Sequence, residues 1–514
     1  MIQLNNPTEA VNWLKANVKG ELRVDSRDIQ AGDGFIAWPG AAVDGRQYVK
    51  SALQKGAAAC LVEHSQLETK GYLAEYKNNT QQDKIASYLN LKIAIGNIAA
   101  KTYNTPARDL NVIAITGTNG KTTSAWWLSQ ALLAFDATNK SNADMQNTKC
   151  FMVGTLGIGV PNAVDETVEF TGLTTPDPIL LHKKFREYVD HGFKYCAIEA
   201  SSIGIEEHRL DGTDIKVAIF TNFTQDHLDY HGSMEAYWEA KLKLFQWPML
   251  KVAVINIGDV KGQELVNTLK NTNLDIWTVA VDQSARIKAF DITYSKQGLQ
   301  FNIIENNEIH AIETKFVGKY NVSNLLGVIA AMRASGIALT DCVEACKSLT
   351  AVPGRMDMLA KEGQPLVIVD YAHTPDALKQ ALIALRPVAD SRSGKLLCVF
   401  GCGGNRDASK RPLMARMAEE YADTVVVTTD NSRNEKTESI LNNIIAGFKT
   451  KEKFSVEANR AIAIAKSIKN ASQNDVILIA GKGHENYQDE LGVKTYFSDK
   501  EHAWHEMTKD GVAA

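Results

Sequence analysis

Short apolar runs alternate with amphipathic helical stretches along the chain from residue 111 onward. Two series of such runs occur, at residues 111–115, 195–200, 216–222 and 251–256, and again at residues 365–371, 395–401, 423–430 and 475–481. Continuous apolar runs separated by helical patterns are typical of buried parallel strands joined by crossover helices. The pattern therefore predicts an α/β protein with two mainly parallel sheets in this part of the chain.

The first hundred residues have a shorter pattern of the same kind. Residues 21–27 predict a short strand that leads into a polar turn, and residues 32–40 predict a second strand that ends in Pro39-Gly40. Residues 49–63 predict a helix followed by a strand, whereas the polar stretch at 78–83 is typical of a surface loop. These elements predict a smaller α/β domain at the N-terminus.

The length of 514 residues agrees with about three domains at roughly 150 residues each. The pattern changes near residues 107 and 352, so we expect domains at residues 1–107, 108–352 and 353–514.

The net charge of −4 gives no support for a nucleic-acid partner. No apolar run is long enough to span a membrane, and the N-terminal residues lack the features of a secretory signal. The seven cysteines are odd in number and form no CxxC pair, which favours a reducing, cytoplasmic location without a disulfide scaffold or structural zinc.

A glycine-rich segment between the run at 111–115 and a predicted helix is typical of a phosphate-binding loop. It reads Thr-Gly-Thr-Asn-Gly-Lys-Thr-Thr over residues 116–123. Glycines allow backbone N–H groups to surround a phosphate, and the helix N-terminus adds partial positive charge. Lys121 can reach the β- and γ-phosphates and the Thr122 hydroxyl can bind Mg²⁺. Ile115 stands where the common pattern has its first glycine, so this is a shortened variant of the loop.

Acidic and imidazole side chains follow the next predicted strands. Glu199 ends the run at 195–200, and ligands of open α/β sheets gather at the carboxyl ends of strands. Mg²⁺ prefers oxygen ligands, so Thr122 and Glu199 form the favoured pair. His227 follows the run at 216–222 and would lie near Glu199 if the two strands were neighbours. From chemistry alone, a capping or core histidine is the more favoured interpretation of His227.

Lys241 lies on a predicted helix with Tyr237, Leu244 and Phe245 on the same side. This pattern alone favours a surface lysine whose stem packs on apolar neighbours.

Motifs spread over nearly the whole chain, in the expected order, resemble those of the Mur ligases. They are TGTNGKTT, EASS, TNFTQDHLDYHGSMEAYWEAK, GKYNVSNLLGVIAA, VPGRMD, VDYAHTPDAL, FGCGGNRD and GKGHE. Mur ligases are ATP-dependent amide ligases that build the peptide stem of bacterial peptidoglycan. The similarity is greatest to the members that add the third residue, usually meso-diaminopimelate or L-lysine, to UDP-MurNAc-L-Ala-D-Glu. The resemblance implies a UDP-sugar-binding N-terminal domain, a central P-loop ATPase domain and a Rossmann-like C-terminal domain that binds the incoming amino acid.

The resemblance also implies roles for residues of the central domain. Glu199 and His227 match Mg²⁺ ligands, and Lys241 matches a lysine that CO₂ converts into a carbamate at the metal site. Together with Lys121 these are the catalytic residues that we expect, and Thr122 completes the metal set. The expected ATP-binding residues are Gly117, Thr118, Asn119, Gly120, Lys121, Thr122, Thr123, Asn321, Asn324, Arg355 and Asp370.

The positions that match the family's UDP-sugar site include two departures. Ile203 stands where the family often has histidine, and Glu207 where it often has glutamine. An acid beside an anionic substrate is electrostatically unfavourable, so Glu207 is the weakest member of the set. The expected UDP-sugar-binding residues are Val24, Ser26, Ala41, Ala42, Val43, Thr174, Thr175, Ser201, Glu207 and Arg209.

The C-terminal region carries the positions that match an amino-acid site. Residues 430–433 read Asp-Asn-Ser-Arg and resemble the diaminopimelate motif Asp-Asn-Pro-Arg. The Arg433 guanidinium can bind a distal carboxylate that lysine lacks, which favours meso-diaminopimelate over lysine. Ser432 replaces a proline whose fixed φ would stiffen the loop. The expected set is Arg406, Asp430, Asn431, Ser432, Arg433, Gly481 and Glu485.

Several alternatives stay open at this point. The same reaction with L-lysine, another Mur ligase or a folylpolyglutamate-type ligase would share most of these motifs. The segment Val-Asp-Ser-Arg at 24–27 favours a UDP-sugar substrate. A P-loop ATPase or kinase with an acceptor other than a carboxylate is a further alternative, and dependence of ATP turnover on an amine co-substrate would distinguish it. A binding protein without activity fits less well, because Lys121, Thr122, Glu199, His227 and Lys241 are all present. We expect a cytoplasmic monomer that uses ATP and Mg²⁺.

Overall fold

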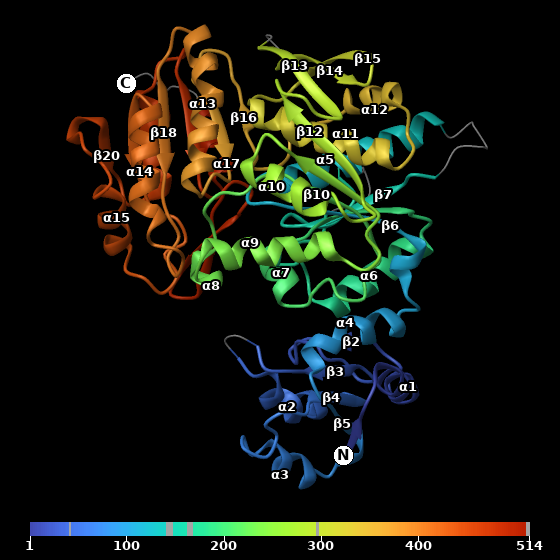
Figure 1. Cartoon of the computed structure of the whole chain (residues 1–514). Helices are drawn as coiled ribbons and strands as arrows, with labels where there is room; N and C mark the ends of the chain where they lie inside the picture. The colour runs from blue at the N-terminus through green and yellow to red at the C-terminus, as the bar shows by residue number, and fades with distance from the viewer. Residues whose placement is uncertain (41–42, 140–146, 162–167, 295–297, 510–514) are drawn as a thin grey trace. The chain divides into compact units, whose positions relative to one another are not determined.

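The computed structural model describes residues 1–40, 43–139, 147–161, 168–294 and 298–509 (Figure 1). The Cα positions fall into two compact units, each made of several segments. The first unit contains Met1–Thr116, Asp136–Ala218 and Ala240–Val252, and the second contains Gly117–Phe135, Ile219–Glu239 and Ala253–Ala514. Both units are mixed α/β structures.

The N-terminal part of the first unit is a five-stranded parallel sheet. Its strand order is β1 (Ile2–Leu4), β5 (Ile85–Tyr88), β4 (Ala59–Glu63), β3 (Gly34–Ala37) and β2 (Leu22–Arg23). Successive strand residues point to opposite faces, so Ile36 packs with one apolar cluster and Phe35 with the other. The surrounding helices are α1 (Pro7–Asn17), α2 (Val49–Gln54), α3 (Tyr72–Lys77) and α4 (Leu91–Thr102).

The longest sheet contains the strands predicted at 111–115, 195–200, 216–222 and 251–256, which confirms those predictions. Its order is β15 (Glu308–Thr314), β14 (Leu299–Glu305), β13 (Ile287–Tyr294), β12 (Asp275–Val281), β11 (Val252–Asn256), β10 (Ile215–Phe220), β6 (Asn111–Thr116), β9 (Tyr195–Glu199), β7 (Cys150–Gly154) and β8 (Gly157–Gly159). β6, β9 and β7 are parallel, and Ile115 pairs with Glu199. β13, β14 and β15 form an antiparallel meander that the sequence analysis missed.

Helices connect these strands, and several begin at residues suited to capping. Asp177 accepts hydrogen bonds from two N–H groups of the first turn of α6, and Pro178 occupies its first position. Ser201 caps α7 through the N–H of Gly204. The helices are α5 (Lys121–Asn139), α6 (Pro178–Asp190), α7 (Ser202–Glu206), α8 (Leu228–His231), α9 (Met234–Leu242), α10 (Val260–Leu269), α11 (Lys319–Ala334) and α12 (Leu339–Cys346).

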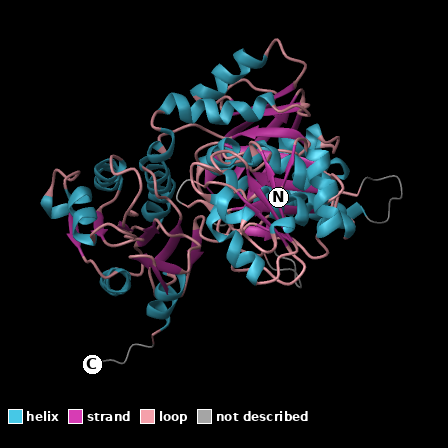
Figure 2. Cartoon of the chain, turned by 90° about the horizontal axis from the view of Figure 1, so that it is seen from below, coloured by secondary structure: helices cyan, strands magenta, loops and turns pink. Residues whose placement is uncertain are grey.

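The C-terminal part of the second unit is a six-stranded sheet with helices on both faces (Figure 2). The order is β16 (Asp357–Leu359), β17 (Leu366–Asp370), β21 (Val476–Ala480), β18 (Leu396–Phe400), β19 (Thr424–Val427) and β20 (Phe454–Val456), and only β16 is antiparallel. The four strands predicted here are therefore confirmed. The helices are α13 (Pro375–Ser391), α14 (Lys410–Tyr421), α15 (Thr437–Ile445), α16 (Arg460–Asn470) and α17 (Asp499–Thr508).

A short antiparallel hairpin of β22 (Tyr487–Glu490) and β23 (Val493–Tyr496) follows β21. The apolar core of this part lies on both faces of the sheet, because Ile368 packs with one cluster and its neighbours Val367 and Val369 with the other. None of the described helices is long and apolar enough to cross a membrane.

Candidate active site

The phosphate loop follows β6 directly and ends where α5 begins at Lys121, as the sequence predicts. Gly117 and Gly120 have φ of 144° and 85°, which other residues rarely adopt. A Cβ at Gly120 would lie 2.3 Å from Oδ1 of Asn324, so glycine allows α11 to approach the loop. The Lys121 ammonium donates to the carbonyls of Gly117 and Thr118, both at 2.7 Å. The lysine thus lies over the loop where a phosphate would bind.

The segment after β10 holds the loop in this shape. The N–H of Asn119 donates to Oδ1 of Asn222 at 2.9 Å, and the Thr221 hydroxyl donates to the Asn119 carbonyl at 2.6 Å. The N–H of Thr224 donates to the Thr118 hydroxyl at 2.9 Å. These bonds fix the loop before any ligand binds, which lowers the cost of binding a phosphate.

The nucleotide residues expected outside the loop also lie near it. Arg355 donates to the Thr122 hydroxyl at 3.2 Å, and its guanidinium lies 4.2 Å from the centre of the Tyr371 ring. Buried Asp370 accepts the N–H groups of Met356 and Ala372 at 2.7 and 2.8 Å. Burial raises the pKa of Asp370, although Arg355 acts in the opposite direction. Arg355 therefore joins Thr122 of the loop to the region of Asp370 and Tyr371.

In the first unit, Glu199 ends β9 with its side chain buried. Its carboxylate accepts the N–H and the hydroxyl of Thr155 at 2.8 and 3.2 Å. A Cβ at Gly154 would lie 2.2 Å from Oε1 of Glu199, so this glycine makes room for the carboxylate. Thr155 was missed by the sequence analysis because nothing in the neighbouring sequence distinguishes it from other threonines.

The structure corrects two interpretations of the remaining metal candidates. β6 lies between β9 and β10, so the strands that precede Glu199 and His227 are not neighbours. His227 begins α8 with φ of 55° and makes no capping hydrogen bond through its side chain. Lys241 is 1% exposed, which contradicts the interpretation as a surface lysine. Among the described residues, no group of three or more His, Cys, Asp and Glu side chains is arranged to hold a metal.

Four residues of the expected UDP-sugar set gather beyond the end of β9. The Thr175 hydroxyl donates to the Glu199 carbonyl at 2.8 Å and contacts the Ser201 hydroxyl at 3.0 Å. Arg209 donates to the Thr175 carbonyl at 3.1 Å, and the Thr174 and Thr155 hydroxyls are 3.1 Å apart. Ser26 is buried in the N-terminal domain, Val24 and Val43 are exposed, and Ala41 and Ala42 lie outside the described residues.

Glu207 has a partner that the sequence analysis did not identify. Lys92 of α4 contacts its carboxylate at 2.7 Å, and both side chains are partly exposed. The lysine offsets the negative charge that made Glu207 the weakest member of the expected set. Glu207 and Lys92 thus form a neutral pair where the family often has a neutral glutamine.

Apart from Arg406, the expected amino-acid residues lie at the carboxyl ends of β19 and β21, where open α/β sheets bind ligands. Asn431 donates to Glu485 at 2.8 Å, and Arg433 donates to the Gly404 carbonyl at 2.8 Å. Gly481 has φ of 115°, and a Cβ there would lie 2.7 Å from Asp430. Burial raises the pKa of Asp430, but the nearby cations, Lys482 first, hold it below its usual value.

A cluster around Asp226 was not identified from the sequence. Its carboxylate lies 3.5 Å from His373, 3.5 Å from His227 and 3.7 Å from Lys410. Burial raises the pKa of Asp226, but the bond from His373 and the surrounding cations hold it well below its usual value. The loop after β10 and the two loops after β17 and β18 therefore meet at one buried carboxylate.

Two further contacts extend this junction between the loop after β10 and the C-terminal region. Gln225 donates to Asp407 and to Ser409, both at 3.1 Å. Arg406, expected to bind a carboxylate, lies 3.8 Å from Asp229 and is half exposed. Arg406 therefore lies at this junction, whereas Arg433 and Glu485 lie in the group at the strand ends.

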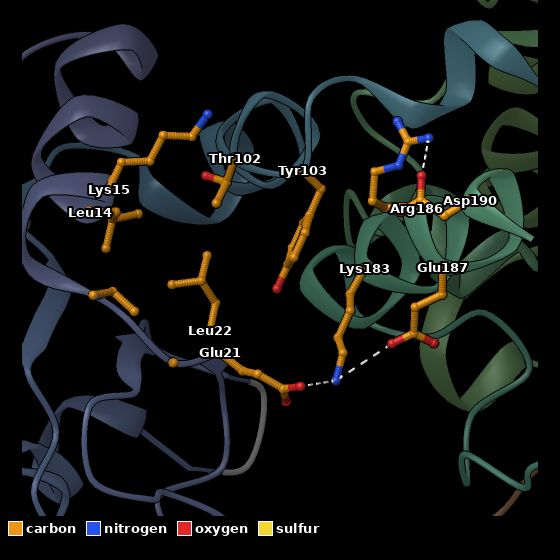
Figure 3. A pocket seen from close by; sticks show the side chains of 12 residues that line it. Leu14, Lys15, Glu21, Leu22, Thr102, Tyr103, Lys183, Arg186, Glu187 and Asp190 are labelled. Atoms are coloured by element: carbon orange, nitrogen blue, oxygen red, sulfur yellow. Dashed lines mark hydrogen bonds and ion pairs between the residues drawn. The ribbon is translucent and has the colours of Figure 1, made fainter.

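A cavity of about 280 Å³ lies elsewhere in the first unit, between α1, β2 and α6 (Figure 3). Lys183 contacts Glu21 at 2.6 Å, and Arg186 contacts Asp190 at 2.7 Å. None of the described residues that line it belongs to the expected site. Lys183 contacts both Glu21 and Glu187, Arg186 contacts Asp190, and Lys15 contacts Asn104, so we assign the cavity no ligand.

Comparison with known proteins identifies the family. The family model described as "Mur ligase family, catalytic domain" matches residues 21–103, "Mur ligase middle domain" matches 115–332, and "Mur ligase, glutamate ligase domain" matches 354–483. The chain is 50% identical over 507 residues to the UDP-N-acetylmuramoyl-L-alanyl-D-glutamate–2,6-diaminopimelate ligase of Acidovorax sp. (strain JS42), covering 98% of each chain. The protein of the same name from Coxiella burnetii is 40% identical, with 94% of each chain covered.

Solved structures agree with these sequence matches. A structure of UDP-N-acetylmuramoyl-L-alanyl-D-glutamate–2,6-diaminopimelate ligase has a TM-score of 0.61 and 32% identity, covering 95% of this chain and 94% of that one. The folylpolyglutamate synthase of Mycobacterium tuberculosis, with a TM-score of 0.60 and 18% identity, covers 76% of this chain and 92% of its own, and shares the fold. The phosphate loop, its supporting residues and these matches together show that the chain belongs to the Mur ligase family.

Proposed function

We propose that this chain catalyses the ATP-dependent addition of meso-diaminopimelate to the side-chain carboxylate of D-glutamate in UDP-MurNAc-L-Ala-D-Glu, a step of peptidoglycan precursor synthesis in the cytoplasm. Relatives that match almost the whole chain carry the name of this ligase. The observation that carries the proposal is the group at the strand ends of the C-terminal sheet, where Arg433 and Glu485 supply a cation and an acid.

The three segments 1–107, 108–352 and 353–514 would divide the work. The first would bind the UDP-sugar through Val24, Ser26 and Val43, and the second would bind ATP at the phosphate loop. The third would bind the amino acid. The ADP complex of the Thermotoga maritima MurF ligase, a protein of similar fold, supports the assignment of a nucleotide site.

The reaction would proceed through an acyl phosphate. The D-glutamate carboxylate attacks the γ-phosphorus of ATP, the bond to the β–γ bridging oxygen breaks, and ADP leaves. Lys121 and the loop N–H groups offset the charge of the transferring phosphoryl group. The amine of diaminopimelate then attacks the acyl carbon, inorganic phosphate leaves, and the amine loses a proton as the amide forms. Water would hydrolyse the acyl phosphate, so the reacting groups need to be enclosed.

Mg²⁺ fits the donors present, because it is commonly bound by one or two carboxylates together with substrate phosphates. The Glu199 carboxylate, in the space that Gly154 leaves, and the Thr122 hydroxyl are the oxygen donors that would hold it. When bound, Mg²⁺ would neutralise phosphate charge. We also propose that His227 is a ligand and that buried Lys241 carries a carbamate, which turns a cation into a carboxylate-like donor.

The direct test is release of inorganic phosphate with ATP, Mg²⁺ and UDP-MurNAc-L-Ala-D-Glu, with meso-diaminopimelate or L-lysine added in parallel. We expect turnover with diaminopimelate and little with lysine. Turnover with L-lysine but not with diaminopimelate would agree with a ligase reaction but would reject the role of Arg433. Phosphate release that needs no amine would reject the ligase reaction.

The Lys92–Glu207 pair makes a separate prediction about the UDP-sugar. Lys92→Met leaves an acid beside the anionic substrate, so we expect the KM for UDP-MurNAc-L-Ala-D-Glu to rise about fivefold, since a partly exposed pair contributes up to about 1 kcal/mol. The KM for ATP serves as the internal control and should not change. Adding Glu207→Gln to Lys92→Met should restore the KM for the UDP-sugar. A double variant whose KM is as high as that of Lys92→Met would contradict the pairing.

A further inference from the structure

Lys482 is a buried cation within the amino-acid site that none of the roles above uses. It lies between Gly481 and Glu485 immediately after β21, and its side chain is 0% exposed. A buried ammonium is costly unless it is paired and hydrogen-bonded. Its partners therefore indicate what the lysine stabilises.

These partners form a closed triangle of side chains. The Lys482 ammonium donates to Oδ1 of Asn431 at 3.1 Å and to Oε2 of Glu485 at 3.2 Å. The Asn431 amide donates to the same Glu485 oxygen at 2.8 Å. The ammonium also lies 5.4 Å from the centre of the Tyr487 ring, within cation–π range. Each member thus fixes the other two.

The triangle extends to Arg433 through the backbone of the hairpin. Oδ1 of Asn431 also accepts the N–H of Asp489 at 3.0 Å. The N–H of Arg433 donates to the Asp489 carbonyl at 2.9 Å, and the N–H of Leu491 donates to the Arg433 carbonyl at 2.7 Å. These bonds hold Arg433 at φ of 50°, which is unusual for arginine. The hairpin thus restrains the backbone of Arg433 directly.

The charges of this group are balanced. Lys482 and Arg433 are cations, and Asp430 and Glu485 are acids. Meso-diaminopimelate carries two ammonium and two carboxylate groups at neutral pH, so an electrically balanced site complements it. Without Lys482 the group would have an excess of negative charge and Glu485 would lose a fixed orientation.

We propose that Lys482 is a positioning residue that fixes Glu485 and, through Asn431 and the β22–β23 hairpin, Arg433 for the incoming diamino acid. This inference rests on the proposed function. A positioning role requires that the loss of Lys482 selectively weakens binding of the amino acid. If the role of Lys482 were purely structural, its loss would weaken binding of all three substrates together.

The test compares Lys482→Met with the wild-type enzyme in the phosphate-release assay. We expect the KM for meso-diaminopimelate to rise at least tenfold, while the KM values for ATP and the UDP-sugar stay within twofold. Lys494→Met is the matched control, because Lys494 is exposed on β23 and its ammonium lies 4.4 Å from the centre of the same Tyr487 ring. It should leave all three KM values within twofold.

A second variant keeps the proposal testable if Lys482→Met does not fold. Lys482→Gln keeps a donor for Asn431 but removes the charge, and the same selective tenfold rise is expected. A rise below threefold, or an equal rise for all three substrates with a lower Tm, would overturn the positioning role. The wild-type enzyme distinguishes this inference from the proposed function. If its turnover depends on diaminopimelate but the Lys482 variants show no selective rise in KM, only the role of Lys482 is rejected.

Discussion

Replacing Lys121 with alanine is expected to lower kcat by about 10³-fold or more, which corresponds to roughly 4 kcal/mol of lost transition-state stabilisation. The Lys121 ammonium lies over the phosphate loop and donates to the carbonyls of Gly117 and Thr118, both at 2.7 Å. In the reaction it would bind the phosphoryl group as negative charge redistributes. No other cation of the loop can take its place, because the remaining residues at 117–123 are neutral.

The fold of the Lys121→Ala variant should persist. Lys121 is the first residue of α5, and alanine favours helix. The loop keeps its bonds to Asn222 and Thr221, which involve other residues. Circular dichroism and the Tm would verify the fold. Lys261→Ala is the matched control, because Lys261 is a partly exposed lysine at the start of α10. Activity within tenfold of wild type in a folded Lys121→Ala variant would reject the assignment of the phosphate loop.

Strands such as β9, β17 and β21 were predictable because burial on both faces leaves a continuous apolar run in the sequence. The strands β13 to β15 were missed for the opposite reason. In β14, Phe301 and Ile303 are buried while Gln300 is exposed, so the apolar residues alternate with others. Such alternation over a few residues is a weak signal in a chain otherwise dominated by continuous runs.

The phosphate loop was also predictable, because its residues are consecutive. The contacts that complete the site join distant parts of the chain, as in Lys92 with Glu207 and Lys410 with Asp226. The sequence contains no local pattern that links such pairs. The position of β6 between β9 and β10 shows the same limit, since strand order depends on the path of the chain through the whole sheet.

The Asp226 cluster explains how the loop after β10 can respond to the C-terminal region. Asp226 precedes His227, a proposed metal ligand, and its carboxylate contacts His373 after β17 and Lys410 at the start of α14. A buried carboxylate that loses its partners is costly, so the contacts with His373 and Lys410 restrain the loop that carries Asp226. The conformation of the loop at 224–229 is therefore coupled to that of the C-terminal strand ends.

The second large effect concerns the choice of amino acid. Arg433→Ala is expected to raise the KM for meso-diaminopimelate by about 100-fold, because a hydrogen-bonded pair of charged groups is worth up to about 3 kcal/mol. L-lysine has no distal carboxylate, so its weaker turnover should not fall further. The ratio of kcat/KM between the two amino acids, measured by phosphate release, should therefore collapse. The KM for ATP should stay within twofold.

Arg386→Ala is the matched control, because Arg386 lies on α13 and contacts the partly exposed Asp423 at 2.9 Å. It should change neither amino acid's KM. The Arg433 side chain also donates to the Gly404 carbonyl at 2.8 Å, so a general loosening of this loop is the competing explanation. Loosening would raise the KM for lysine and diaminopimelate alike, whereas loss of a carboxylate contact affects only the substrate that has the carboxylate. An unchanged preference for diaminopimelate in a folded Arg433→Ala variant would show that another cation, such as Arg406, binds the distal carboxylate.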